Sequence, residues 1–476
     1  MGKLKSSHII ITLLILTGGG AIIWWLTKDP VSDLSLSLPG TDNRGSDSVF
    51  EEDVKIGSLF ESFSDEKAEG TEVWACFRGA DRDNISDTQF HLKSNLDHDK
   101  LPVVWKTELG EGHAGAAIYK GQVFVLDYME DERADMLRCF DLKTGKELWR
   151  RGYKVKIKRN HGMSRTVPAV TGDYVVTIGP RCQVMCVDRL TGDFRWGIDI
   201  EKEYQTEEPL WYTGQCPFID NGKVIIATGG KALLIAVDCA SGEKLWEVPN
   251  TGNWDMSHAS VMPFTFKGRK MYVYSAVGGV CGVSAEGDDE GKLLWESSEW
   301  NHSVVAPSAL CLPDGKIFLT AGYGAGSMVM QLIENNGSFS VKVLDEFKPK
   351  DGLACEQQTP VVWKGHVFGI MPKEGGANRN QFVCVDPKDF RKMVWTSGKD
   401  KRYGLGPYFM ADDKFFLLND DATLTIIEPS VNEFKVLDEV KLFDGQDAWA
   451  PLATADGYLV LRDSKTLICL DMYVER

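Results

Sequence analysis

The sequence lacks the short motifs that mark many cofactor and nucleotide sites. Its 11 cysteines form no CxxC pair and no CxxCH haem-attachment motif, and no two of them are adjacent. HExxH, the P-loop glycine motif and the GxSxG nucleophile elbow are also missing. These gaps argue against covalent c-type haem, the common zinc and thiol-redox sites, and enzymes built on the other three motifs.

Positive charge is also scarce. The chain holds 53 Lys and Arg against 69 Asp and Glu, for a net charge of −16. An acidic surface repels phosphate backbones, so no nucleic-acid partner is expected. One basic run, Arg150–Arg159, interrupts this balance, but its lysines alternate with Val155 and Ile157. Such alternation is typical of a half-buried strand with a solvated face.

Four cysteines recur at one place in the sequence. Cys139, Cys186, Cys384 and Cys469 each stand two residues before an Asp. A residue type that recurs at one repeat position indicates a small buried side chain filling the same packing site. We therefore predict mostly reduced, buried thiols rather than disulfides.

The N-terminus contains one long apolar run. Residues 9–27 carry no charge and follow Lys3 and Lys5. About 20 apolar residues span a bilayer as a helix, and flanking lysines tend to stay in the cytoplasm. We predict a cytoplasmic tail and transmembrane anchor over residues 1–28, in the bacterial inner membrane, with the rest in the periplasm. The alternative is a secretory signal cleaved near the small residues 18–21.

Residues 29–70 are rich in Ser, Asp, Glu and Gly and poor in aromatics. Such a segment cannot bury enough apolar surface to offset its chain entropy. It is predicted to be an acidic flexible linker.

The remainder of the chain is repetitive. In residues 140–149, 187–196 and 237–246, an apolar run ends in Asp, a Thr/Ser-Gly turn follows, and Trp comes eight residues after the Asp. Asp and Gly suit a hairpin turn, and Trp can cover the gap to the next unit. Another strand pair precedes each Asp. Units of four short strands, 47 to 50 residues apart from Trp149 to Trp295, match the blade of a β-propeller.

The innermost strands of eight such units can be counted. They begin near His113, Thr166, Gln215, His258, Ala306, Thr359, Gly406 and Trp449. The eighth unit lacks a fourth strand, whereas residues 102–107 form an isolated strand around Trp105. Pairing the two would close the ring and cover its edges. The sequence thus predicts an all-β, eight-bladed β-propeller over residues 71–476, with the Trp105 strand completing the last blade.

The D-x-x-[TS]-G-x-x-x-W pattern resembles that of the quinoprotein-like (PQQ-like) repeat family. This family includes quinoprotein alcohol dehydrogenases and BamB-type outer-membrane assembly propellers. Residues 74–86 (WACFRGADRDNIS) are also similar to the lead-in of exported propellers in planctomycete-like bacteria. The resemblance covers about residues 74–476. It implies the fold and a location outside the cytoplasm more than it implies a chemistry.

The resemblance also raises the question of a PQQ cofactor with Ca²⁺. Such a site needs stacking Trp, basic partners for three carboxylates, oxygen ligands for Ca²⁺ and an Asp base. The larger alcohol dehydrogenases of the family carry an adjacent Cys-Cys pair, which this sequence lacks. Blade docking already accounts for the repeat tryptophans. No cofactor or metal is therefore predicted, and a PQQ-dependent dehydrogenase remains an alternative.

The starts of the innermost strands surround one mouth of the central channel and carry polar side chains. The candidate ligand-binding residues are His113, Arg165, Gln215, His258, Gln358 and Trp449, with His161 and His302 nearby. Convergent polar groups in a concave site can bind a ligand or peptide end, although a solvated mouth tolerates such residues without any ligand. The predicted function is a non-catalytic scaffold that binds protein partners at a propeller face or at blade edges. The alternatives are a PQQ enzyme and a glycan or small-ligand receptor.

Overall fold

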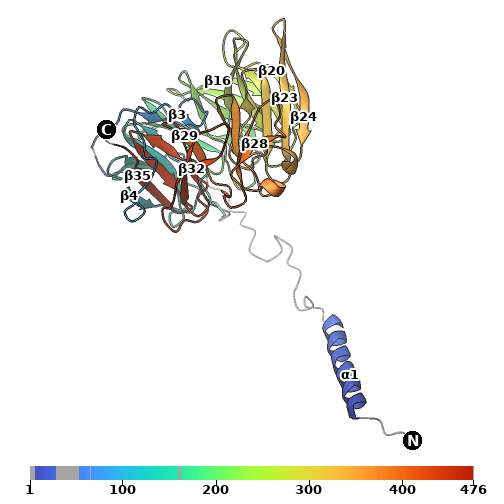
Figure 1. The fold of residues 1–476 in the computed structure, drawn as a ribbon. Coiled ribbons are helices and arrows are strands. Elements are labelled where there is room, and N and C mark those ends of the chain that lie inside the picture. Colours follow the sequence, from blue (N-terminus) through green and yellow to red (C-terminus); the bar gives the residue numbers. More distant parts are fainter. Residues whose placement is uncertain (1–5, 28–52, 65, 159–161, 475–476) are drawn as a thin grey trace. The chain divides into compact units, whose positions relative to one another are not determined.

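The computed structural model describes residues 6–27, 53–64, 66–158 and 162–474, which fall into two units divided after Asp53 (Figure 1). In the first unit, the apolar run forms helix α1 (Ser6–Thr27). Its side chains are described from Leu14 to Trp25. In the described part of the chain, no helix is long and apolar enough to span a membrane.

The second unit, Val54–Arg476, contains eight β-sheets in sequence order, as expected for an eight-bladed propeller. Each sheet holds a blade of four antiparallel strands. Blades 1 to 3 consist of β5 (Ala117–Tyr119), β6 (Gln122–Met129), β7 (Ala134–Asp141) and β8 (Glu147–Lys154); β9 (Ala169–Val170), β10 (Tyr174–Ile178), β11 (Gln183–Asp188) and β12 (Phe194–Asp199); and β13 (Phe218–Asp220), β14 (Lys223–Ala227), β15 (Ala232–Asp238) and β16 (Lys244–Pro249). Between blades 2 and 3 lies the short helix α2 (Ile200–Tyr204).

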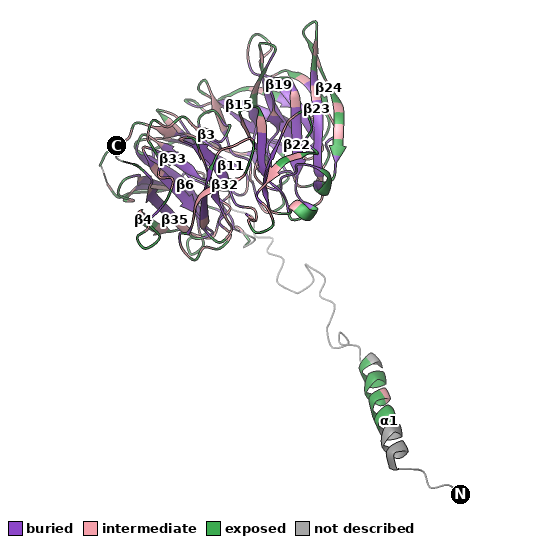
Figure 2. Cartoon of the chain, in the orientation of Figure 1, coloured by how far each residue is buried: buried purple, intermediate pink, exposed green. Residues whose placement is uncertain are grey.

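The later blades follow the same plan. Blades 4 to 6 consist of β17 (Met262–Phe266), β18 (Arg269–Ala276), β19 (Gly279–Ser284) and β20 (Leu293–Ser297); β21 (Leu310–Cys311), β22 (Lys316–Ala321), β23 (Gly326–Asn335) and β24 (Ser338–Phe347); and β25 (Val361–Trp363), β26 (His366–Ile370), β27 (Phe382–Val385) and β28 (Met393–Thr396). Blade 7 comprises β29 (Tyr408–Ala411), β30 (Lys414–Leu418), β31 (Thr423–Glu428) and β32 (Lys435–Lys441). The two middle strands of each blade are mostly buried, whereas the outer strand β24 alternates between exposed and half-buried residues over most of its length (Figure 2).

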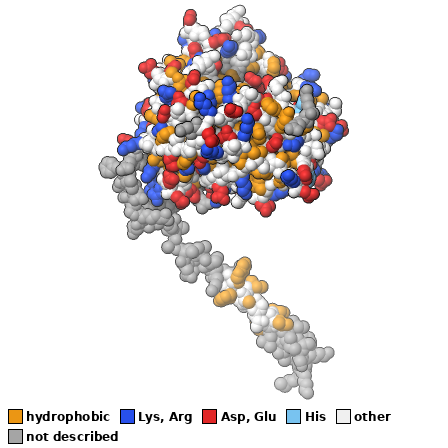
Figure 3. All heavy atoms as spheres, turned by 90° about the vertical axis from the view of Figure 1, so that its left-hand side faces the viewer, with side chains coloured by type: hydrophobic (Ala, Val, Ile, Leu, Met, Phe, Trp, Pro, Cys, Tyr) orange, Lys and Arg blue, Asp and Glu red, His pale blue; other side chains and the backbone are white. Residues whose placement is uncertain are grey.

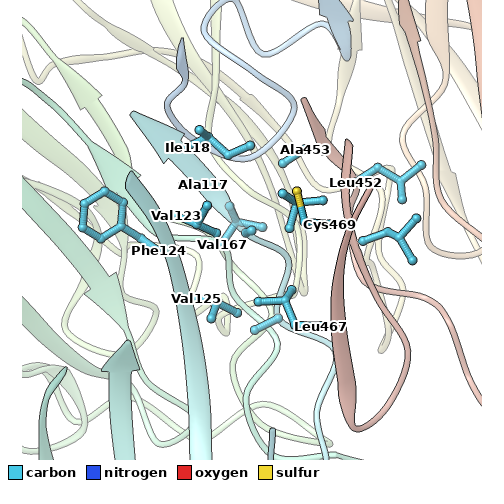
Figure 4. Packing of buried hydrophobic residues seen from close by; sticks show 14 of the residues in the cluster. Ala117, Ile118, Val123, Phe124, Val125, Val167, Leu452, Ala453, Leu467 and Cys469 are labelled. Carbon is cyan, nitrogen blue, oxygen red and sulfur yellow. The ribbon is translucent and has the colours of Figure 1, made fainter. Parts of the chain in front are cut away.

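Blade 8 closes the ring as the sequence predicts. Its strands β33 (Ala453–Ala455), β34 (Tyr458–Arg462) and β35 (Thr466–Asp471) are completed by β4 (Val103–Glu108), with Trp105 paired to Cys469. Apolar side chains from blades 8 and 1, including Leu467 and Val125, share one buried cluster (Figure 4). The propeller therefore has no open seam between its first and last blades.

The repeat tryptophans join neighbouring blades. The Nε1 atom of Trp105 donates a hydrogen bond to the carbonyl oxygen of Leu142 at 2.7 Å, and that of Trp196 to Cys239 at 2.9 Å. Each indole also lies against the turn glycine of the next blade, where a Cβ would collide with the ring. The pairs are Trp105 with Gly145, Trp149 with Gly192, Trp196 with Gly242, and Trp246 with Gly291. These glycines also have positive φ, so both the turn and the docking require them.

The predicted linker, residues 29–70, lies outside the described residues up to residue 52, whereas part of its second half is packed on the propeller. Strand β1 (Leu59–Ser62) pairs antiparallel with β8, the outer strand of blade 1, and the Arg151 guanidinium lies 4.0 Å from the Phe60 ring centroid. The polar composition of the segment did not indicate its two apolar contacts with the propeller, Phe60 and Ile56. Ile56 packs on Gly197. This strand also accounts for part of the basic run, since Arg151 donates to the carbonyl oxygens of Gly57 and Gly192.

Candidate ligand-binding site

A chain of hydrogen bonds links the innermost strands around the channel. In each step, a backbone N–H donates to a side chain of the next blade. Val167 donates to Cys216 Sγ at 3.2 Å, Cys216 to Ser260 Oγ at 3.0 Å, Ser260 to Ser308 Oγ at 3.0 Å, and Ser308 to Thr359 Oγ1 at 2.8 Å. This relay holds blades 2 to 6 in register at the channel wall.

Beyond the relay, residues 73–86 cross the channel. Strand β2 (Val73–Trp74) pairs with β5 of blade 1, and β3 (Ile85–Ser86) pairs in parallel with β29 of blade 7. Between them, the carbonyl oxygen of Ala75 accepts a hydrogen bond from Val170 in blade 2 at 2.8 Å. We call residues 73–86 the plug, because they tie together blades on different sides of the ring.

Two buried arginines fasten the plug. The guanidinium of Arg78 donates to the carbonyl oxygens of Thr359 at 2.7 Å and Pro360 at 3.1 Å, both in blade 6. That of Arg82 lies 4.8 Å from the Phe218 ring centroid in blade 3. Burial lowers the pKa of Arg78 to about 10, so the group stays charged at neutral pH. Residues 74–86, which resemble the lead-in segment of exported propellers, therefore close the channel.

A cavity of about 130 Å³ lies on the other side of the plug, at the starts of the innermost strands. Its lining comes from blades 1 to 6 and blade 8, and the plug adds Phe77. Five of the six predicted residues line it: His113, Arg165, His258, Gln358 and Trp449. Since the plug contacts the strands further along, the cavity is a blind pocket open at one face.

Three of the residues named from the sequence, Gln215, His302 and His161, are not among the described residues that line the pocket. Gln215 is fully buried and does not line the pocket, because its amide bonds the backbone N–H and C=O of Ala227 at 2.6 and 2.8 Å. The His302 ring contacts Trp300 edge-on, with centroids 4.3 Å apart. His161 lies outside the described residues.

Trp449 differs from the docking tryptophans, as its position suggests. Its indole lies 4.8 Å from the His113 ring, tilted by 30°, and its Nε1 donates to Asp420 Oδ1 at 3.0 Å. Asp420 also accepts from the backbone N–H of Leu405 at 2.9 Å. Burial raises the pKa of Asp420 despite these two donors. Trp449 therefore connects the pocket wall to an acidic group in blade 7.

Of the pocket residues His258 and Arg165, only the arginine carries a positive charge at neutral pH. Burial, together with the charge of Arg165, lowers the pKa of His258 to about 4. The imidazole is therefore neutral near pH 7. Burial also lowers the pKa of Arg165 to about 10, which leaves it cationic.

Sequence reasoning missed the aromatic rim of the pocket. Trp211 and Tyr323 stack with ring centroids 5.5 Å apart and planes 28° apart. Both residues have positive φ, 65° and 57°, in loops of blades 3 and 5. Tyr323 is 53% exposed. The spacing of Gly322, Gly324 and Gly326 in the sequence does not show where the Tyr323 ring points.

Glu356 was missed as well. It is only 7% exposed, lines the pocket, and packs against Gly322, where any side chain would collide with it. Its Oε2 atom is buried and accepts no hydrogen bond from the described residues. Burial raises the pKa of its carboxyl; Lys373 opposes this increase, whereas Glu374 adds to it.

The pocket does not fit PQQ with Ca²⁺. Arg165 is the one Lys or Arg among the described lining residues, whereas PQQ carries three carboxylates. The described chain holds no group of three or more His, Cys, Asp or Glu placed to bind a metal ion. Ca²⁺ needs six to eight oxygen ligands.

The fold and the site define an eight-bladed β-propeller with a blind pocket at the mouth of a plugged channel. Residues 132–303 match the family model described as outer membrane protein assembly factor BamB. This match confirms the resemblance to the PQQ-like, BamB-type β-propeller repeat family read from the repeats.

Solved structures share the fold at low identity. BamB from Moraxella catarrhalis is 12% identical with a TM-score of 0.53, covering 78% of this chain and 100% of that one. A europium-containing methanol dehydrogenase is 12% identical with a TM-score of 0.55, covering 82% and 89%. The quinohemoprotein alcohol dehydrogenase ADHIIG from Pseudomonas putida HK5 is 12% identical with a TM-score of 0.55, covering 85% and 81%. No curated protein sequence matches the chain. These structures support the fold and do not separate binding from oxidation.

Proposed function

We propose that this propeller is a non-catalytic binding module of the bacterial envelope that docks a protein partner on the face carrying the pocket. The observation that carries the proposal is the stacked Trp211–Tyr323 pair at the pocket rim. Leu210, beside it, is 59% exposed. Exposed aromatic rings next to a cavity are the groups that supply most binding energy at protein interfaces.

The plug supports the same choice of face. Residues 73–86 bond the innermost strands of several blades and occupy the other end of the channel. On the molecular face in Figure 3, charged side chains of both signs are interspersed, which suits a solvated surface. Binding at blade edges has a precedent within the chain, because β1 adds a strand to blade 1.

The envelope location is supported by the similarity to BamB-type propellers. The matching family model is described as an outer membrane assembly factor, and the M. catarrhalis protein shares the fold. We propose that the propeller faces the periplasm and that the N-terminal segment directs its export. Fractionation of cells separates the outcomes: recovery in the envelope fraction supports the location, and recovery in the cytosol contradicts it.

Position-specific photocrosslinking in intact cells tests the docking face. A benzophenone amino acid replaces Leu210 at the rim or Leu245 on the outer edge of blade 3, which are 59% and 52% exposed. We expect a discrete adduct from Leu210 and none from Leu245, and the adduct should disappear with Trp211→Ala. Equal adducts from both positions, or an adduct unaffected by Trp211→Ala, would contradict the proposed face.

A further inference from the structure

We propose that the blind pocket binds a primary ammonium group carried on an alkyl chain, with Glu356 as its acceptor. This inference goes beyond the docking function and does not depend on a protein partner. It adds a site for a chemical group at the same propeller face.

The first reason is a buried acceptor without a donor. Glu356 is 93% buried, and its Oε2 accepts no hydrogen bond from the described residues. A buried polar atom left in this state costs free energy, which a ligand N–H recovers. The Oε2 of Glu374, on the following loop of blade 6, is also buried without a donor in the described part of the chain.

The second reason is the sign of the charge around this acceptor. Burial is the main cause that raises the pKa of the Glu356 carboxyl; Lys373 opposes it, and the negative charges of Glu374 and Asp420 add to it. A cation in the pocket would relieve this repulsion, whereas an anion would add to it. Arg165 belongs to blade 2, four blades from Glu356 in a ring of eight, so the two charges lie on opposite sides of the mouth.

The third reason is the aromatic rim. An ammonium group is attracted to the face of Tyr or Trp within about 6 Å of the ring centroid. Nζ of Lys373 already lies 5.4 Å from the Tyr323 centroid, which shows that this ring accepts an ammonium ion. Lys373 itself is mostly exposed and pairs with Glu374 Oε1 at 3.9 Å. The Glu356 oxygen is left for a ligand.

The shape of the pocket favours an alkyl chain behind the ammonium group. Apolar side chains from the plug and from two blades line the cavity: Phe77, Val304, Ala306 and Pro451. A volume of about 130 Å³ is compatible with a chain of a few methylenes and is small for a sugar ring or a flat polycyclic ligand. Gln357 and Gln358 offer amide oxygens to further N–H groups.

The same group can come from a free diamine or from a lysine side chain of a protein. Isothermal titration calorimetry on the purified full chain distinguishes them, using cadaverine and N-acetyl-lysine methylamide as probes. Their neutral counterparts are 1-pentanol and the Nε-acetylated lysine derivative. We expect saturable binding of at least one amine and at least tenfold weaker binding of its neutral counterpart.

Glu356→Gln should weaken amine binding at least tenfold, because it removes the charge and keeps the size of the side chain. Tyr323→Leu, at the exposed rim, should weaken it several-fold without affecting folding. Glu203→Gln, on helix α2 outside the pocket, is the matched control and should bind as the parent does. Binding should also weaken as the pH falls and Glu356 takes up a proton.

The binding results distinguish the two sources of the ammonium group and show whether the proposal holds. If only the lysine derivative binds, the site is assigned to a lysine side chain of a partner protein. If cadaverine binds comparably well, the site is assigned to free amines. Neutral counterparts that bind as well as the amines, amines that do not bind, or unchanged affinity in Glu356→Gln would overturn the proposal. None of these results bears on the photocrosslinking pattern, so the docking function stands or falls separately.

Discussion

Cys469 lies directly opposite Trp105 across the antiparallel pair of β35 and β4. The same opposition recurs in blades 1, 2 and 6, where Cys139 faces Trp149, Cys186 faces Trp196 and Cys384 faces Trp395. In blades 3 and 4 the residue opposite the tryptophan is Ala236 or Gly282. The position opposite the tryptophan requires a small residue, because the indole lies beside it and extends to the next blade.

Replacing Trp105 by alanine should destabilise the propeller by about 3 to 5 kcal/mol. The change removes the indole from Gly145, breaks its hydrogen bond to Leu142, and opens the seam between blades 8 and 1. Val104→Ala on the same strand, at a residue 40% exposed, is the control and should cost below about 1 kcal/mol. Denaturant unfolding measures both, and equal losses would show that the seam does not depend on Trp105.

The recurring cysteines show how far sequence reasoning reached. Their spacing before Asp predicted a small buried side chain, and all 11 cysteines are free, ten of them buried. Blade number, turn chemistry and ring closure were predictable for the same reason. Each is set by a local pattern that repeats, and a repeat reveals which positions share one environment.

Features that occur once could not be predicted in this way. Strand β1 was missed because its four residues sit in a segment of disordered composition, and its pairing with β8 depends on a distant strand. The Trp211–Tyr323 pair was missed because positive φ at both residues decides where the rings point. Glu356 was missed because its position depends on its contact with Gly322 in another blade. Gln215 was assigned to the pocket from its position alone, but it bonds Ala227 along the blade.

Arg78→Lys should loosen the plug. The planar guanidinium of Arg78 bonds four backbone carbonyl oxygens, those of Arg82, Asp83, Thr359 and Pro360, at 2.7 to 3.1 Å. A lysine ammonium cannot reach all four, so we expect a loss of about 2 to 4 kcal/mol. Hydrogen exchange should accelerate in residues 75–86 first.

Arg195→Lys provides the comparison for that experiment. Arg195 is 46% exposed and pairs with Asp188 at the surface, so its replacement should leave exchange in the plug unchanged. Protection of residues 75–86 that survives Arg78→Lys would show that the β2 and β3 pairings hold the plug by themselves.

Asp135 should make stability depend on pH. Its carboxylate is buried and accepts from Ser164 Oγ at 2.9 Å and Tyr153 OH at 3.2 Å. Burial raises its pKa to about 7, above its ordinary value of 3.8. The folded state therefore holds this proton more tightly than the unfolded state, and stability falls as the pH rises from about 4 to about 7, by up to about 4 kcal/mol.

Asp135→Asn removes that proton uptake. The variant should lose less stability than the parent between pH 4.5 and pH 7.5, as measured by urea unfolding at the two pH values. An identical loss in parent and variant would mean that Asp135 does not titrate in this range when folded.

The central claim is that the channel mouth is a pocket whose charge preference is set by Glu356. Thiol modification of Gln358→Cys tests it directly, because ten of the native cysteines are buried and the pKa of the half-buried Cys311 is raised by burial. Rates with a cationic and an anionic methanethiosulfonate reagent are compared after normalising each to a free thiol. We expect at least tenfold faster reaction with the cationic reagent, and loss of that preference when Glu356→Gln is added. Equal normalised rates, or a preference that survives Glu356→Gln, would contradict it.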